Sequence, residues 1–296
     1  MIKHFSAFAG IGGACSALEQ AGADFSTVGI SEINKQACHL RHAIIGDNAP
    51  NIGDINKKNW EKEEIDLYTG GFPCQPFSLL GLRKGMQDPR AQAMLSMQQM
   101  ILDVKPKYVL LENVAGIMTA KQWPEVRRWL TAFRGYSIHV HKSNPHDLGY
   151  LQSRTRVFIA LSRNDMRPWI IPDQLPKLAK RQTWGAIKDK KVNPSEFISI
   201  VKKPRIVYVA DDTTKKFQCF TRRAIDSHCG RATWITHGNG YRGPTPAEFF
   251  RLFGYANPPQ IKIQKGRISR SSIGMGFGNS WHVGHAGLIL ETLPIQ

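Results

Sequence analysis

The stretch HFSAFAGIGGACSALEQA, residues 4–21, decides the fold class of this 296-residue chain. An apolar run, a glycine-rich turn and a helical pattern follow one another in it, which predicts a strand over 4–8 and a helix over 13–21. The same order continues to about residue 160: strands are expected over 27–30, 65–68, 108–111, 137–141 and 157–161, and helices over 34–45, 90–103 and 125–133. Such alternation is typical of a doubly wound, mostly parallel sheet covered by helices on both faces, so the predicted fold class is α/β.

The pattern becomes irregular after residue 167, where prolines punctuate short mixed segments. Two strands and two helices are expected beyond this point, over 205–209, 233–236, 245–253 and from 281 or 283 to 293. Thr245 can cap the first of these helices, because Pro246 suits the first helical position. The sequence therefore predicts two domains, one built from residues 1–170 and 244–296 and one inserted as residues 171–243.

The net charge of +17 at pH 7 is the strongest compositional fact. The charge is concentrated, since residues 171–243 carry 15 Lys and Arg against 6 Asp and Glu. A surface this basic favours a polyanionic partner, most commonly nucleic acid, although a solvated lysine-rich face would give the same count. We therefore predict that the inserted segment is a domain that contacts phosphates.

The sequence argues against secretion, membranes and metals. It shows no signal-peptide layout and no apolar run near the roughly 18 residues that span a bilayer, so a cytoplasmic protein without a membrane partner is expected. Five cysteines without a CxxC pair, and histidines without metal-ligand spacing, predict neither structural disulfides nor a metal site.

Cys74 lies in GGFPCQPFS, residues 70–78, shortly after a predicted strand. Most intracellular cysteines are small buried hydrophobic residues, which is the plainer interpretation. Two glycines and two prolines nevertheless indicate a loop at the end of a strand, where functional side chains concentrate. We therefore interpret Cys74 as a candidate nucleophile.

The glycine-rich turn of FAGIGG, residues 8–13, would let a ligand approach the backbone and the helix N-terminus, although a simple tight turn explains it equally well. Glu32 ends the second predicted strand about 20 residues later, where an acid binds ribose hydroxyls in nucleoside-binding sheets. Asp54 and Ile55 follow Gly53 and could hold an adenine by one polar and one apolar contact.

Glu112 directly follows a very apolar strand, at the edge where open α/β sheets place their sites; a structural pairing with an arginine is the alternative. Gln152, Arg154 and Arg156 precede another strand. Alternation along an extended chain turns these three side chains to one face, so two guanidiniums could converge on a site, with a generic basic edge strand as the competing interpretation.

Taken in order, these motifs resemble those of the DNA cytosine-5 methyltransferases: FAGIGG at 8–13, the acid at 32, GDI at 53–55, GGFPCQPFS at 70–78, ENV at 112–114, QSRTR at 152–156, PTPAEFFRLFGY at 244–255 and GNS at 278–280. The resemblance spans nearly the whole chain outside 171–243, where such enzymes hold their target-recognition domain. It implies a Rossmann-like catalytic domain, S-adenosylmethionine as methyl donor, and a cytosine that is flipped out of double-stranded DNA.

The resemblance also implies residue roles. Cys74 would add to cytosine C6, Glu112 would hold N3 and N4, and Arg156 would contact the base carbonyl, with Arg154 supporting the loop and the developing charge. Cofactor contacts are implied for Phe8, Ala9, Gly10, Ile11, Gly12, Gly13, Glu32, Ile33, Asp54, Ile55, Pro73, Asn279 and Ser280. DNA contacts are expected from Gln75, Ser78, Lys202, Lys203 and Arg205.

The chain departs from the family pattern in two places. The family usually shows Asp-x-Arg-Gly-x-Leu-Phe after the catalytic loop, whereas residues 88–94 read DPRAQAM, and Leu151 stands where a proline is common. Cys219-Phe220-Thr221 resembles a tripeptide of the family branch that methylates transfer RNA.

Three alternatives follow from these observations: the same chemistry on RNA, a nucleic-acid-binding homologue that has lost turnover, and, more distantly, a nicotinamide dehydrogenase. The dehydrogenase explains neither the cysteine loop nor the basic segment. A monomer from a bacterial or phage-infected cell is expected by resemblance. The sequence gives neither the target site nor whether the enzyme belongs to a restriction system, because base readout depends on where a few side chains reach the groove.

Overall fold

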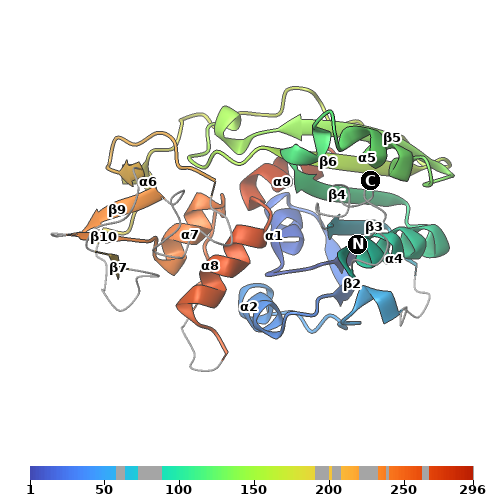
Figure 1. The fold of residues 1–296 in the computed structure, drawn as a ribbon, viewed down its shortest axis with the longest axis horizontal. Coiled ribbons are helices and arrows are strands. Elements are labelled where there is room, and N and C mark those ends of the chain that lie inside the picture. Colours follow the sequence, from blue (N-terminus) through green and yellow to red (C-terminus); the bar gives the residue numbers. More distant parts are fainter. Residues whose placement is uncertain are drawn as a thin grey trace.

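The computed structural model describes residues 1–57, 64–72, 89–190, 200–201, 208–219, 233–237, 240–261 and 267–295. Its larger sheet has six strands: β1 (Ile2–Ala7), β2 (Phe25–Ser31), β3 (Leu67–Gly71), β4 (Tyr108–Val114), β5 (Tyr136–Ser143) and β6 (Arg156–Arg163). They are arranged in the order β2-β1-β3-β4-β6-β5, and only β6 runs against the others. The largely parallel sheet confirms the predicted α/β fold class (Figure 1).

Helices cover both faces of this sheet. On one face, α1 (Gly13–Gln20) packs against α9 (Val283–Leu290), and both join a hydrophobic cluster with Leu110 and Phe158. On the other face, α4 (Pro89–Val104) and α5 (Trp123–Leu130) pack in a second cluster with Val109. Two layers of helix around one sheet bury the apolar residues of β4 on both sides, which explains why this strand is apolar throughout.

Local capping signals define the helix boundaries. α2 (Lys35–Ile45) begins after Asn34, whose side chain accepts hydrogen bonds from the amides of Gln36 and Ala37, and it ends at Gly46 with a φ of 74°. α7 (Pro246–Leu252) begins after Thr245, which forms a capping box with Glu248. The predicted cap at Thr245 is therefore confirmed.

A second sheet of four short strands lies beside α7, at the end of the molecule away from β5 (Figure 1). Its strands, in spatial order, are β7 (Ile200–Val201), β10 (Gly240–Arg242), β9 (Thr233–His237) and β8 (Tyr208–Ala210). Together with the short helix α6 (Trp184–Ile187), it shares the hydrophobic cluster of α7. The four strands and α6 fall within the predicted insertion; the boundaries at 171 and 243 stay a prediction.

The helix α8 (Arg270–Asn279) was not predicted from the sequence. Its residues RSSIGMGFGN are rich in serine and glycine, which have low helix propensity. Tertiary packing supports it instead, because a Cβ on Gly276 would lie 2.6 Å from Ile11 and 3.1 Å from Leu40, so only glycine allows this close approach. Among the described residues, the 3-10 helices η1 (Ile55–Lys57), η3 (Ala115–Met118) and η4 (Pro145–Leu148) were also not predicted.

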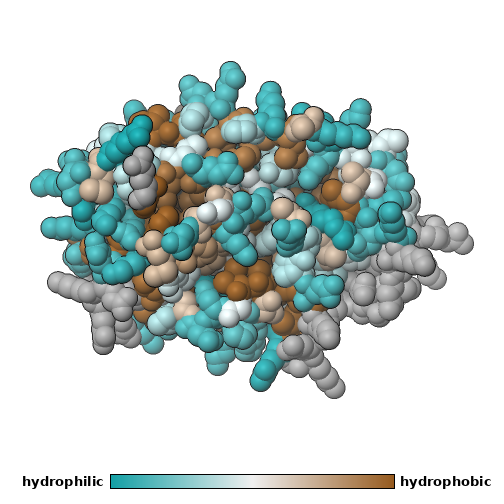
Figure 2. Space-filling view, turned by 180° about the vertical axis from the view of Figure 1, so that it is seen from behind, coloured by the Kyte–Doolittle hydropathy of each residue, from teal (hydrophilic) through white to brown (hydrophobic). Residues whose placement is uncertain are grey.

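Among the residues described here, no helix is long and apolar enough to cross a bilayer. Figure 2 shows the face of the molecule opposite to Figure 1, where hydrophilic side chains form most of the outline and hydrophobic residues show between them.

Candidate active site

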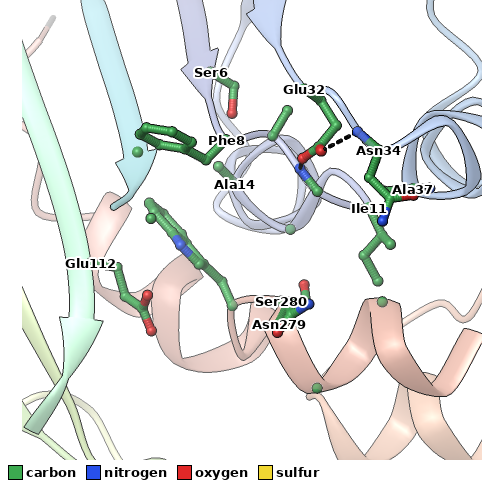
Figure 3. A pocket seen from close by; sticks show the side chains of 18 of the residues that line it. Ser6, Phe8, Ile11, Ala14, Glu32, Asn34, Ala37, Glu112, Asn279 and Ser280 are labelled. Carbon is green, nitrogen blue, oxygen red and sulfur yellow. Dashed lines mark hydrogen bonds between the residues drawn. The ribbon is translucent and has the colours of Figure 1, made fainter. Parts of the chain in front are cut away.

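A cavity of about 580 Å³ lies at the carboxyl ends of β1, β3 and β4, beside the N-terminus of α1 and the C-terminal end of α8. Figure 3 shows Glu112 toward one end and Glu32 with Asn34 toward the other. The predicted site residues on its wall are Phe8, Ala9, Gly10, Ile11, Gly13, Glu32, Glu112, Arg154, Arg156, Asn279 and Ser280.

The turn between β1 and α1 is held in an unusual backbone conformation. Phe8 has a φ of 52°, which is uncommon for a residue other than glycine, and Gly10 has a φ of 54°. The amide of Ala9 donates to the carbonyl of Ser31 at 3.0 Å, so β2 fixes the turn. Such conformations cluster at ligand sites, and here Phe8 faces the cavity (Figure 3).

Glu32 closes the turn from the side of β2. Its Oε2 accepts from the amide of Gly10 at 2.8 Å, and its Oε1 accepts from the amide of Asn34 at 2.8 Å. Both carboxylate oxygens keep a further lone pair and lie at the cavity, so Glu32 can still accept hydroxyl groups.

Two features of the wall suit a charged ligand with polar ends. α1 starts at Gly12 without a side-chain cap, so its first amides and its positive end face the cavity through Gly13 and Ala14. The hydroxyl of Ser280 is buried and finds no hydrogen-bond partner among the described residues. An amino-acid carboxylate would satisfy both, and hydroxyls of a ribose would reach Glu32, so the residues fit S-adenosylmethionine.

Glu112 and Arg156 form an ion pair on the cavity wall. The antiparallel register of β4 and β6 pairs Val114 with Arg156, which makes Glu112 and Arg156 diagonal neighbours on one face. Arg156 Nε donates to Glu112 Oε1 at 2.7 Å, and the two side chains are 10% and 12% exposed. The Glu112 carboxylate points into the cavity (Figure 3), where a base could contact both charged groups.

Arg154 is directed away from this pair. Its Nη2 donates to the carbonyl oxygens of Gly278 at 3.1 Å and Ser280 at 2.7 Å, and its guanidinium lies 5.3 Å from the centre of the Phe253 ring. Burial, and then the charge of Arg156, lower the pKa of Arg154 to about 10, so it remains a cation at neutral pH. In this structure Arg154 supports the loop that carries Asn279 and Ser280.

The loop with the candidate nucleophile begins next to Glu112. β3 and β4 pair Gly71 with Glu112, and the side-chain Nδ2 of Asn113 donates to the carbonyl of Phe72 at 2.9 Å. Asn113 therefore anchors the start of the loop. Cys74 is the second residue after Phe72, but it lies outside the described residues, as do Pro73, Gln75, Ser78, Lys202, Lys203 and Arg205.

Four residues expected to contact the cofactor are not on the described cavity wall: Gly12, Ile33, Asp54 and Ile55. Gly12 packs toward α2, where a Cβ would lie 2.7 Å from Ile45. Ile33 is 74% exposed, whereas Ile55 is 4% exposed and belongs to a hydrophobic cluster. The cofactor contacts of all four residues, including the adenine contacts of Asp54 and Ile55, stay predictions.

The cavity also has walls that sequence reasoning missed. Met275 lies in α8, and Trp281 is the second residue after the end of that helix. Gln36 lies in the first turn of α2. A signal for α8 existed, since Ser269 and Ser272 are spaced as a capping box and Ile273 follows.

Across the described ranges, no group of three His, Cys, Asp or Glu side chains is gathered in a way that could hold a metal ion.

Comparison with known proteins identifies the family. The family model for C-5 cytosine-specific DNA methylase matches residues 2–223. The chain belongs to this family. Type II methyltransferase M.NgoBI of Neisseria gonorrhoeae is 30% identical over 285 residues, which cover 91% of this chain and 87% of that protein. Orphan methyltransferase M.Rho11sI of Bacillus phage rho11s is 32% identical over 194 residues, which cover 61% of this chain and 38% of that protein.

A solved structure shows the same fold. The crystal structure of the S. pombe Dnmt2 methyltransferase superposes with a TM-score of 0.83 at 23% identity and covers 99% of this chain and 98% of its own. C-5 cytosine methyltransferases take their methyl group from S-adenosylmethionine. The resemblance found in the sequence is therefore confirmed, as is the Rossmann-like methyltransferase fold.

Proposed function

We propose that the chain is a DNA (cytosine-5-)-methyltransferase that acts on a flipped-out cytosine in duplex DNA through a covalent adduct of Cys74. The observation that carries this proposal is the Glu112–Arg156 pair, which lies on one cavity wall with the turn of Phe8 to Gly13 on another. A cytosine at this wall would contact both the Glu112 carboxyl group, which can accept a hydrogen bond or hold a proton, and the Arg156 guanidinium, which is a cation.

The residues divide the reaction as follows. The Cys74 thiolate forms a bond to C6 while the C5–C6 double bond opens, and the electron pair makes C5 nucleophilic. Glu112 hydrogen-bonds the exocyclic amino group and holds a proton at N3, and Arg156 donates to the base carbonyl. S-adenosylmethionine, when bound, supplies an electrophilic methyl group to C5. A base then removes the C5 proton, and loss of the thiolate restores the double bond.

Cofactor positioning comes from the opposite end of the cavity. Glu32, the first amides of α1, Ser280 and Asn279 are the residues that would hold S-adenosylmethionine. Phe8 would lie near its sulfonium, since an aromatic face attracts a cation. Within the stretch that departs from the family pattern, Met94 is 1% exposed and belongs to the same hydrophobic cluster as Met97 and Ile101.

The basic segment 171–243 binds the nucleic acid that carries the target cytosine. Among its described residues, exposed cations are Lys177, Lys180, Arg181, Lys190, Lys215 and Lys216. Phosphate contacts release counterions, so affinity should fall steeply with salt. Alanine at Lys202, Lys203 or Arg205 should weaken duplex binding and lower the salt slope by about one per lost phosphate contact, and an unchanged slope would place this surface elsewhere.

A second candidate function is cytosine-5 methylation of RNA. It is favoured by Cys219, the first residue of the tripeptide noted above, whose Sγ lies 3.6 Å from Arg154 Nη1. Transfer of a tritiated methyl group to duplex DNA or to transfer RNA by the purified protein distinguishes the two substrates. Label in transfer RNA alone would overturn the DNA proposal.

A mechanism-based trap tests the covalent step and the loss of turnover in one experiment. With S-adenosylmethionine present, DNA containing 5-fluorocytosine should form a complex that resists denaturation, because after methyl transfer C5 carries fluorine in place of the proton that must leave to release the thiolate. Cys74→Ser should abolish that complex, whereas Cys38→Ser, on α2 and outside the cavity wall, should keep it. A complex that persists in Cys74→Ser would contradict the assigned nucleophile, and its absence from the unaltered protein would favour an inactive homologue.

A further inference from the structure

Part of the basic segment is joined by its main chain to the residues that carry the site arginines. We call residues 151–156 the arginine segment. The amide of Ser153 donates to the carbonyl of Phe217 at 2.8 Å, and the amide of Phe217 donates to the carbonyl of Leu151 at 2.8 Å. Phe217 is fully buried, and its ring packs against Trp184 with 5.4 Å between centroids. The arginine segment and the basic segment therefore move together at this point.

Arg154 extends this connection to the cofactor end of the cavity. One amino group of its guanidinium, Nη1, contacts Cys219 Sγ at 3.6 Å, two residues after Phe217. The other amino group, Nη2, donates to the carbonyls of Gly278 and Ser280. One rigid planar cation thus touches the basic segment on one side and the loop with Asn279 and Ser280 on the other.

Arg154 should respond to movement of either neighbour, Cys219 in the basic segment or the loop with Asn279 and Ser280. Arg154 is 2% exposed, and bonds from a buried charge to its acceptors are expensive to lose. Because the fork of the guanidinium is planar, Nη1 cannot follow Cys219 without moving Nη2 against the carbonyls of Gly278 and Ser280. A displacement of the basic segment therefore reaches the cavity wall at Ser280 through a single side chain.

We propose that Arg154, held by Cys219, is a positioning residue that couples nucleic-acid binding by the basic segment to cofactor binding at Gly278–Ser280. The proposal rests on the function proposed above. Binding of a DNA duplex then changes the cofactor affinity by a coupling factor, and the cofactor changes the duplex affinity by the same factor. Removing the contact between Cys219 and Arg154 should lower this factor without removing either binding site.

The test measures the dissociation constant of S-adenosylhomocysteine by calorimetry, with and without a saturating mixed-sequence DNA duplex. In the unaltered protein the duplex should change this constant by about fivefold or more. Cys219→Ala should bring the ratio close to one and leave affinity without DNA nearly unchanged. Cys219→Ser keeps an acceptor for Arg154 and should retain the ratio, as should Asp212→Ala, a matched exposed position in the same segment.

An unchanged ratio in Cys219→Ala overturns the proposal, and so does a ratio of one in the unaltered protein that binds both partners. If Cys219→Ala unfolds, Arg154→Lys decides instead: lysine keeps the charge without the planar fork, so its ratio should also fall, and an unchanged ratio overturns the coupling. Failure of the unaltered protein to bind S-adenosylhomocysteine, or to bind the duplex, would contradict the proposed function and not the coupling alone.

Discussion

Glu112 in the six-stranded sheet and Glu248 at the base of the four-stranded sheet both pair with an arginine, yet their surroundings differ. Among the described residues, Glu112 forms an ion pair with Arg156, and it lies on a cavity wall. Glu248 is fully buried and accepts four hydrogen bonds, two from Arg242 and one each from the amides of Thr245 and Asp189.

This difference indicates a chemical role for Glu112 and a structural role for Glu248. A carboxylate with unused lone pairs in a cavity can accept a substrate, whereas a carboxylate with all its lone pairs engaged holds its neighbours in place. The Glu248 cluster joins β10, at the end of the basic segment, to the start of α7 and to the chain at Asp189, within the same segment. Changes at the cavity pair should therefore affect turnover, and changes at the buried pair should affect folding.

The largest effect is expected at the cavity. Glu112→Gln keeps the size and one acceptor but loses the acid, so methyl transfer should fall by about a thousand-fold, within the range of acid–base catalysis. The thermal midpoint should hardly change. A tritiated-methyl assay and a melting curve measure both, and activity near that of the unaltered protein would remove Glu112 from the mechanism.

The next effect is on stability. Glu248→Ala removes the carboxylate that accepts two hydrogen bonds from the buried Arg242, whose side chain is 4% exposed, so the free energy of unfolding in urea should fall by about 3 kcal/mol. Glu125→Ala, which breaks the exposed pair with Arg128, is the matched control and should cost under about 1 kcal/mol. Equal costs in the two variants would show that burial does not distinguish these pairs.

A pH effect extends the comparison to a buried group in α9, the helix that packs on the six-stranded sheet. Burial, with smaller contributions from His141 and Arg156, lowers the pKa of His285 to about 3. The unfolded chain takes up this proton near pH 6.5, so the folded state loses about 1.4 kcal/mol per pH unit as the pH falls from 6.5 toward 3.

His285→Gln should therefore reduce the slope of unfolding free energy against pH in this window. The exposed His39 supplies the control, because His39→Gln should leave the slope as it is. Urea titrations at several pH values measure it, and equal slopes for the unaltered protein and His285→Gln would contradict a neutral buried imidazole.

The smallest effect is expected at the helix cap beside Glu248. Thr245→Ala removes the side-chain acceptor for the amide of Glu248 and should cost about 1 kcal/mol. Thr245→Ser keeps the hydroxyl and should therefore retain most of the stability that Thr245→Ala loses. Chemical denaturation compares them, and an alanine variant as stable as the serine variant would mean that the buried pair holds α7 without its cap.

Sequence reasoning worked best where the signal was local. The alternation of strands and helices over the first 160 residues, the turn before α1 and the cap at Thr245 all depend on neighbouring residues, and the structure shows each of them. The helix α8 was not predicted, because its serines and glycines are poor helix formers. It is stabilised by close packing on Ile11 and Leu40, which are distant in the sequence.

The sequence by itself determined the fold class, the family and the residue types at the site, because strand periodicity and motif spacing are written along the chain. Only the tertiary structure decided the direction of each polar side chain. The register of β4 and β6 brings Arg156 to Glu112, and folding turns Arg154 to the carbonyl of Ser280, 126 residues away. Contacts over such separations depend on packing, which no local pattern records.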